Sequence, residues 1–214
     1  MSRRKIDSRG EKALGVFLDI YFYPKMAEER LLPIAQRIYA KSLQRKGIDI
    51  LIGNQTKVDE KAQLYYINRP VESFAFEIDY YDESANHIVD GWFINNSNET
   101  DAYLLMWIPE ARTTHINRLV AEDFEYIDAD YLRKNRLKAY TERLGLYDTT
   151  LKKNALMMRE KNIERLSIND DCYMTYSIKG YSEKPINLVV RKSVLDEMSD
   201  NIFEIRKDNV KVVR

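Results

Sequence analysis

The sequence has few of the residues on which most recognisable active sites are built. It contains one cysteine, Cys172, and two histidines, His87 and His115, among 214 residues. A single cysteine excludes an intramolecular disulfide and any multi-cysteine zinc site, and two histidines offer little to a histidine-based nuclease or a zinc hydrolase. The 7 glycines form no G-x-G pair, Walker A loop or G-x-S-x-G elbow. Signatures of dinucleotide-binding, P-loop and serine-hydrolase sites are therefore missing.

Long apolar runs are missing as well. The longest one near the N-terminus, from Ala13 to Tyr23, is interrupted by Asp19 and is too short to span a bilayer, and no small-residue cleavage site follows it. Charged residues make up 32% of the chain and apolar ones 44%, with 15 Tyr and 7 Phe, as is typical of globular proteins. We therefore expect a cytoplasmic protein with no membrane partner.

The formal net charge is zero, but the charge is unevenly distributed. Between Glu72 and Asp101 there are eight acidic residues and no Lys or Arg, whereas ten Lys and Arg residues face five acidic ones between Asp130 and Arg165. Either one surface is suited to meet a polyanion, or these are ordinary solvated faces. The candidates for contact with a nucleic-acid backbone are Lys46, Arg133, Lys134, Arg136, Lys138, Lys152 and Lys153.

The order of elements favours the α/β class with a mixed central sheet. Helices are expected over residues 11–23, 28–43, 129–144, 149–163 and 193–198, with Pro24 ending the first and Asp128 capping the third. Strands are expected over residues 48–52, 58–67, 73–80, 102–108, 172–178 and 186–190, with an extended piece at 89–94. Because no repeat or linker marks a boundary, we predict one domain over 1–214, with a core in 1–109 and an elaboration in 110–214.

Two neighbouring predicted strands carry charge where a core strand should be apolar. Asp49 lies on the first, and Asp59 and Lys61 lie on the second, where alternation places them on one face together with Gln63. Two carboxylates suit a hard divalent cation, and an ammonium group can orient water or neutralise charge on a phosphate. The alternative is an Asp–Lys ion pair on a half-exposed strand, with Asp49 capping a turn.

Asp49, Asp59 and Lys61, placed after an acidic N-terminal helix, resemble the motif of the PD-(D/E)XK phosphodiesterase superfamily, which includes restriction endonucleases and Holliday-junction resolvases. Asp49 matches the first Asp, Asp59 the second acid and Lys61 the lysine, although Ile48 stands where the motif has proline. The match covers residues 11–107. It implies a restriction-endonuclease-like mixed sheet flanked by helices, with additional α+β elements in the C-terminal part.

The resemblance also implies roles for residues around the motif. Mg²⁺ or Mn²⁺ would be held by Asp49, Asp59 and Glu11, with help from the backbone carbonyl of Glu60, and DNA would be the substrate. A homodimer is expected because many such nucleases cut two strands with two sites. Further candidates are Asp19 as an alternative helix acid, Gln44 and Gln63 as phosphate contacts or supports of the site, and Glu77, which points either at the site or at solvent.

Hydrolysis of DNA phosphodiester bonds is thus the leading hypothesis. One rival is a nucleic-acid-binding module that keeps the fold without chemistry, and another is a protein-interaction domain that recruits a partner through residues 110–214. Four aromatic residues could stack on bases or simply pack in the core: Tyr65, Tyr66, Trp92 and Trp107.

Overall fold

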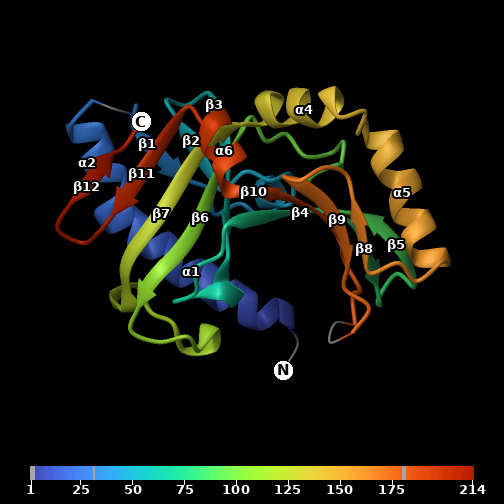
Figure 1. The fold of residues 1–214 in the computed structure, drawn as a ribbon. Helices are drawn as coiled ribbons and strands as arrows, with labels where there is room; N and C mark the ends of the chain where they lie inside the picture. The colour runs from blue at the N-terminus through green and yellow to red at the C-terminus, as the bar shows by residue number, and fades with distance from the viewer. Residues whose placement is uncertain (1–2, 31, 180–181) are drawn as a thin grey trace. The chain divides into compact units, whose positions relative to one another are not determined.

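The computed structural model describes residues 3–30 (side chains from residue 8), 32–179 and 182–214 (Figure 1). The chain divides into two compact units that alternate along the sequence. The first consists of Met1–Val71, Glu99–Lys134 and Ser199–Arg214, and the second of Glu72–Asn98 and Asn135–Met198. Both contain helices and a sheet, so the chain belongs to the mixed α/β class that the sequence predicted.

The first unit is built on a seven-stranded mixed sheet in the order β1-β2-β3-β6-β7-β11-β12. These strands are β1 (Ala35–Arg37), β2 (Ile50–Ile52), β3 (Thr56–Ala62), β6 (Ala102–Ala111), β7 (Phe124–Arg133), β11 (Asn201–Ile205) and β12 (Val210–Val212). Strands β3 and β6 are parallel, and the other neighbouring pairs are antiparallel. The helical elements are α1 (Arg3–Tyr21), α2 (Tyr23–Glu28), α3 (Lys41–Gln44) and the 3₁₀ turns η1 (Leu64–Tyr66), η2 (Ile116–Arg118) and η3 (Ala121–Asp123).

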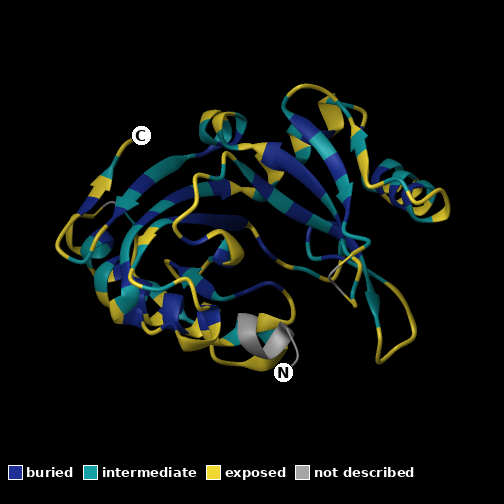
Figure 2. Cartoon of the chain, turned by 60° about the horizontal axis from the view of Figure 1, so that its bottom comes forward, coloured by how far each residue is buried: buried dark blue, intermediate teal, exposed yellow. Residues whose placement is uncertain are grey.

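Helix α1 covers one face of this sheet and carries the apolar stripe that the sequence predicted. Leu14, Phe17 and Leu18 are buried in a cluster that also contains Val58 of β3 and Leu104 of β6. Figure 2 shows α1 with buried residues on one side and exposed residues on the other. Each fully buried large side chain contributes roughly 1.5–3 kcal/mol, so packing of this stripe fixes the helix on the sheet.

Three boundaries in the N-terminal part differ from the prediction. Among the described residues of the range 28–43 there is no continuous helix, because Pro33 lacks an N–H and disfavours helical backbone in the residue before it. The segment instead forms β1 and the short helix α3. The first helix ends before Pro24, as expected, but at Tyr21, and Pro24 lies in the first turn of a second helix, α2, where proline is tolerated. The strand expected over 58–67 is β3, which ends at Ala62 before η1.

The helix predicted from residue 129 begins later. Asp128 does not cap it but pairs with Trp107 of β6 and with Glu204 of β11 inside the sheet. Burial of Ile127 and Ala129 in the core and hydrogen bonding on both edges of β7 favour the strand, and α4 (Lys134–Arg143) follows it. Tertiary pairing here outweighs the local preference for a cap.

The second unit contains a five-stranded antiparallel sheet in the order β5-β4-β10-β9-β8. Its strands are β4 (Ser73–Asp82), β5 (His87–Asp90), β8 (Arg165–Ser167), β9 (Cys172–Tyr176) and β10 (Ile186–Arg191). Helices α5 (Asp148–Glu160) and α6 (Lys192–Met198) pack against its strands. The helices predicted near 149–163 and 193–198 and the strands near 172–178 and 186–190 are therefore confirmed.

The division of the strands between two sheets determines which strand lies beside β3. The strand expected at 73–80 is β4 of the five-stranded sheet, so the parallel neighbour of β3 is β6. The seven-stranded unit also extends beyond the core predicted in 1–109, because it includes β7, β11 and β12. Within the described part of the chain, we find no helix with the length and apolar character needed to cross a membrane.

Candidate functional site

A pocket of about 560 Å³ opens in the seven-stranded unit beside the charged strands. One side is formed by α1, whose residues at helical spacing face the pocket, and the other by the ends of β1 and β3 and the segment before β2. The lining residues are Ser8, Glu11, Lys12, Leu14, Gly15, Val16, Asp19, Arg37, Tyr39, Gln44, Asp49, Asp59, Glu60, Lys61 and Ala62. The three residues of the predicted motif thus share one pocket.

Asp49 is held immediately before β2 by hydrogen bonds on three sides. Its N–H donates to the Val58 carbonyl at 2.9 Å, and its own carbonyl accepts from the Ile38 N–H at 2.8 Å. Its side-chain Oδ2 accepts from the backbone N–H of Glu60 at 2.9 Å. Both flanking strands therefore fix the position of this carboxylate.

Asp59 and Lys61 lie two residues apart on β3 and form an ion pair. The Lys61 Nζ is 2.7 Å from Asp59 Oδ1, and the side chains are 27% and 2% exposed. In the part of the chain that the structure describes, the buried Oδ2 of Asp59 has no hydrogen-bond partner. A buried carboxylate oxygen without a donor is costly, so this atom is suited to a ligand.

The protonation of this pair reflects burial and the neighbouring acid. Burial raises the pKa of Asp59 from 3.8 to about 7; the Lys61 ammonium opposes this shift, and the negative charge of Asp49 adds to it. Burial lowers the pKa of Lys61, but the carboxylates of Asp59, Asp49 and Glu11 outweigh burial and raise the pKa above its ordinary value. Lys61 therefore stays charged at neutral pH.

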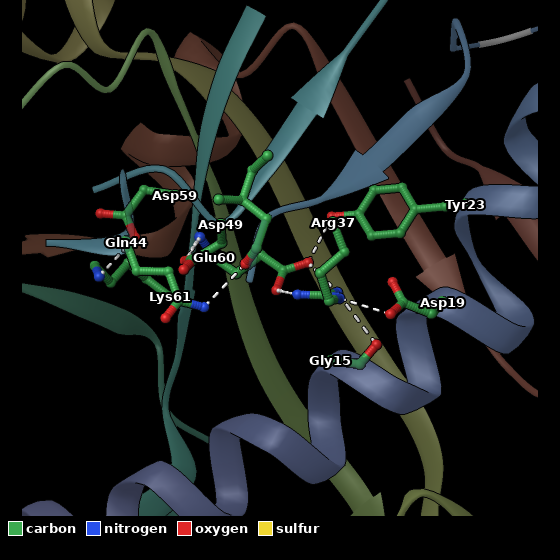
Figure 3. A network of polar contacts seen from close by, with 10 residues as sticks. Gly15, Asp19, Tyr23, Arg37, Gln44, Asp49, Asp59, Glu60 and Lys61 are labelled. Atoms are coloured by element: carbon green, nitrogen blue, oxygen red, sulfur yellow. Dashed lines mark hydrogen bonds and ion pairs between the residues drawn. The ribbon is translucent and has the colours of Figure 1, made fainter. Parts of the chain in front are cut away.

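The side chain of Glu60, the residue between Asp59 and Lys61, takes part in a network of polar contacts around Arg37 (Figure 3). The Arg37 guanidinium donates to Glu60 Oε2 at 2.7 Å and Oε1 at 3.0 Å, to Asp19 Oδ2 at 2.6 Å and to the Gly15 carbonyl at 3.1 Å. The Tyr23 hydroxyl donates to Glu60 Oε1 at 2.7 Å. Burial raises the pKa of Glu60 and the Arg37 hydrogen bond opposes that shift.

The pocket carries an excess of negative charge. Its lining includes five acidic side chains and three basic ones. Together with the unbonded Asp59 oxygen and the adjacent Asp49, this excess fits a divalent cation bound through oxygen ligands. The fit rests on two carboxylates, because no group of three or more His, Cys, Asp or Glu residues is positioned to hold a metal among the described residues.

The remaining predicted site residues fall into three groups. Glu11, Asp19 and Gln44 line the pocket, although Gln44 Nε2 donates to the Ile38 carbonyl at 3.0 Å. Gln63 follows β3 and does not line the pocket. Glu77 lies on β4 in the second unit, on a different sheet from Asp59. The sequence could not show this, since strand periodicity carries no information about which sheet a strand joins.

The basic residues proposed to follow a phosphate backbone are distributed over both units. Lys46 bonds Glu99 and Arg133 bonds Asp200 in the first unit. In the second unit, most of the set is engaged within the protein: Arg136 with the Met198 carbonyl, Lys138 with Asp148, and Lys152 with Asp90. Lys134 and Lys153 complete the set, and its contact with DNA stays a prediction.

The aromatic residues divide between core and surface. Trp107 is buried, and Trp92 packs against Phe76 and Phe93, as the packing alternative predicts. Tyr65 and Tyr66 are 42% and 45% exposed. Base stacking by these two tyrosines stays a prediction.

Sequence reasoning missed Arg37, Tyr39, Lys12 and Ser8, which line the pocket. Arg37 and Tyr39 were hidden because the segment was expected to be a helix, whereas a strand after Pro33 places Arg37 beside β2 and β3. Ser8 and Lys12 could have been found, since they fall at helical spacing from Glu11 and Asp19.

Comparison of the chain with protein-family models, with curated proteins and with solved structures gives no match. The case for a function therefore rests on the geometry of this pocket.

Proposed function

We propose that this protein is a divalent-metal-dependent phosphodiesterase that hydrolyses DNA, with Asp49, Asp59 and Lys61 as its catalytic residues and a fold of the restriction-endonuclease-like type. One observation carries the proposal. Asp59 is buried with one oxygen bonded to Lys61 and the other without a donor among the described residues, next to a second carboxylate in an open pocket. This is the charge arrangement that a Mg²⁺ or Mn²⁺ ion would balance.

Asp49 and Asp59 would bind the cation, with Glu11 and the Glu60 carbonyl as further candidates. Bound there, the ion would supply Lewis-acid activation of the phosphate and a water of lowered pKa. Lys61 remains protonated because of the surrounding carboxylates. It therefore acts as a hydrogen-bond donor to the attacking water or to a phosphate oxygen, and not as a general base.

The test is cleavage of supercoiled plasmid and single-stranded DNA with Mg²⁺ or Mn²⁺, against an EDTA control. Asp49→Ala and Lys61→Ala should each lower the rate at least about 100-fold, in line with the loss of a group that contacts the reacting phosphate. Glu110→Gln serves as the matched control, because Glu110 is an exposed acid of β6 outside the pocket. Equal rates in the parent and both alanine variants would refute the assignment.

Metal binding can be measured apart from cleavage. Saturating Mn²⁺ should raise the melting temperature of the parent, since a ligand at about 100 times its Kd stabilises the folded state by roughly 2.7 kcal/mol. Asp49→Asn should abolish that shift while the protein stays folded, as judged by circular dichroism. A shift of the same size in Asp49→Asn would place the ion elsewhere.

A non-catalytic nucleic-acid-binding module is the second candidate. It is favoured by the lack of a cluster of three or more ligating side chains among the described residues. Salt-dependent DNA binding without cleavage under any divalent ion would select this candidate. DNA as the partner and a homodimer remain predictions, the latter open to light scattering.

A further inference from the structure

Arg37, which the catalytic proposal does not use, belongs to a closed ring of contacts around Asp49. Its guanidinium donates two hydrogen bonds to the Glu60 carboxylate, of 2.7 and 3.0 Å. The Glu60 N–H in turn donates to Asp49 Oδ2 at 2.9 Å. The ring closes through Ile38, the residue that follows β1, because the Ile38 N–H donates to the Asp49 carbonyl at 2.8 Å.

We propose that Arg37 and Glu60 are positioning residues, which hold the Asp49 carboxylate in place for a divalent cation by tying β1 to β3 across it. The inference rests on the proposed function, because only that function calls for a divalent cation at Asp49. The ring itself is a property of the three strands and can be tested without metal.

The contact between Arg37 and Glu60 has the properties of a rigid tie. The two side chains are 16% and 10% exposed, so water competes little for their hydrogen bonds. The pairing is bidentate, which fixes orientation as well as distance. Lysine cannot reproduce it, because an ammonium group is a point charge without the planar fork. Tyr23 also donates to Glu60 and restrains the carboxylate further.

Positioning and simple electrostatics predict opposite results for Arg37. Arg37 is a cation near two acids that would bind another cation, so removing its charge should by Coulomb's law tighten metal binding. If Arg37 instead maintains the geometry of Asp49, removing it should loosen metal binding. Arg37→Lys separates the two effects more cleanly, because it keeps the charge and loses the fork.

The first experiment measures the Mn²⁺ Kd by electron paramagnetic resonance. Arg37→Lys and Arg37→Met should each bind Mn²⁺ at least about tenfold more weakly than the parent, the size typical of residues that orient metal ligands. The matched control is Arg206→Lys, which loses a comparable fork, the pair of contacts from Arg206 to Glu110 at 3.1 and 3.4 Å, in the same unit but outside the pocket. Its Kd should change by less than about threefold. Unchanged or tighter binding in both Arg37 variants would overturn the proposal.

The second experiment needs no metal and follows amide hydrogen exchange by NMR. In Arg37→Lys the Glu60 amide should exchange at least about tenfold faster than in the parent, when both rates are normalised to the core amide of Leu104. Arg206→Lys should leave this ratio unchanged. An unchanged ratio in Arg37→Lys shows that Arg37 does not hold the ring, and the positioning role then fails.

The two measurements separate this inference from the proposed function. A parent protein that binds no Mn²⁺ removes the metal-dependent function, while faster Glu60 exchange in Arg37→Lys still supports the ring. A parent that binds Mn²⁺ with the same Kd as Arg37→Lys keeps the function and refutes the positioning role.

Discussion

Asp59 in the seven-stranded unit and Asp79 in the five-stranded unit are both buried aspartates on strands, and both have a basic partner. Asp59 is 1% exposed and Asp79 is 8% exposed. Burial is the largest cause of a raised pKa for each carboxyl group. Burial and a perturbed pKa therefore do not by themselves distinguish a candidate active site from a structural ion pair.

The difference lies in how each charge is balanced. Asp79 accepts from Arg159, whose guanidinium also donates to the Lys184 carbonyl at 3.0 Å and lies 5.0 Å from the centre of the Tyr176 ring. Asp59 has a lysine partner, but it also has a second acid beside it and a buried oxygen without a donor among the described residues.

Asp79 also has a second acid nearby, Asp90, but Asp90 has its own lysine partner, Lys152. The buried atom of this pair that has no partner among the described residues is the donor Nε of Arg159, not a carboxylate oxygen. Asp79 therefore belongs to an ion pair that is closed to a further cation, whereas the surroundings of Asp59 leave room for one more positive charge.

The largest effect should come from breaking the closed pair. Arg159→Met leaves Asp79 buried without its cation, and the loss of one partner of a buried pair costs about 3–5 kcal/mol in the free energy of unfolding. Urea unfolding can be followed by tryptophan fluorescence in a Trp107→Phe background. Of the 2 tryptophans, only Trp92 then remains, and it lies in the same unit as Asp79.

The matched variant in the other unit is Asp59→Asn, which removes the charge that lacks a full set of partners. Lys61 keeps the carboxylates of Asp49 and Glu11 nearby, so this variant should cost much less than Arg159→Met, and it should abolish the Mn²⁺-induced thermal shift. Arg159→Met should keep that shift. A larger loss of stability for Asp59→Asn than for Arg159→Met would reverse our assignment of the two aspartates.

The sequence allowed part of this comparison to be predicted. Period-two alternation places Asp59 and Lys61 together, and helical spacing places Glu11 and Asp19 on the face of α1 that lines the pocket. These are local rules, which need only the conformation of a single element. Asp49 could be predicted to lie near them because its strand directly precedes theirs in the sequence.

The sequence could not reveal contacts that depend on distant pairing. Arg37 reaches Glu60 only because Pro33 prevents a helix and β1 pairs with β2. Glu77 has the composition expected of a neighbour of the site, yet β4 joins another sheet. Asp128 resembles a helix cap, but strands from both sides of β7 enclose it. In each case the pairing of strands determines the position of the residue, and this pairing cannot be inferred from a single sequence.

An effect of intermediate size is expected in the pH dependence of stability. The pKa of Asp59 is about 7 in the folded protein and 3.8 in its ordinary state, so between these values the folded protein holds a proton that the unfolded chain has released. The free energy of unfolding should therefore fall as pH rises, by about 1.4 kcal/mol per unit. Between pH 5 and 7 this amounts to about 2–3 kcal/mol, and the decline should level off above pH 7.

Urea titrations in EDTA, made at intervals from pH 5 to 8, measure this slope. Asp59→Asn should remove most of it, whereas Asp79→Asn should leave most of it in place. Parallel curves for the parent and Asp59→Asn would show that the Asp59 carboxyl does not retain its proton as we expect, and would remove the contrast between the two aspartates.

The smallest effect concerns the packing of α1 against Arg37. A Cβ atom at Gly15 would lie 3.2 Å from both Cζ and Nη1 of Arg37, so the guanidinium would have to move by a few tenths of an ångström. Alanine in place of glycine also stabilises a helix interior by about 1 kcal/mol. Gly15→Ala should therefore change the free energy of unfolding by less than about 1 kcal/mol, because the two effects oppose each other.

Mn²⁺ binding should respond to this movement of the Arg37 guanidinium more clearly than the free energy of unfolding does. If Arg37 holds Asp49 through Glu60, Gly15→Ala should weaken Mn²⁺ binding by about two- to fivefold, below the tenfold lower limit typical of complete loss of an orienting contact. The control is Ile20→Ala, a 52% exposed position on the same helix that does not line the pocket. Its Mn²⁺ Kd should equal that of the parent. An equal Kd in Gly15→Ala would mean that a small movement of the guanidinium is not transmitted to Asp49, and the ring would then be looser than its hydrogen bonds indicate.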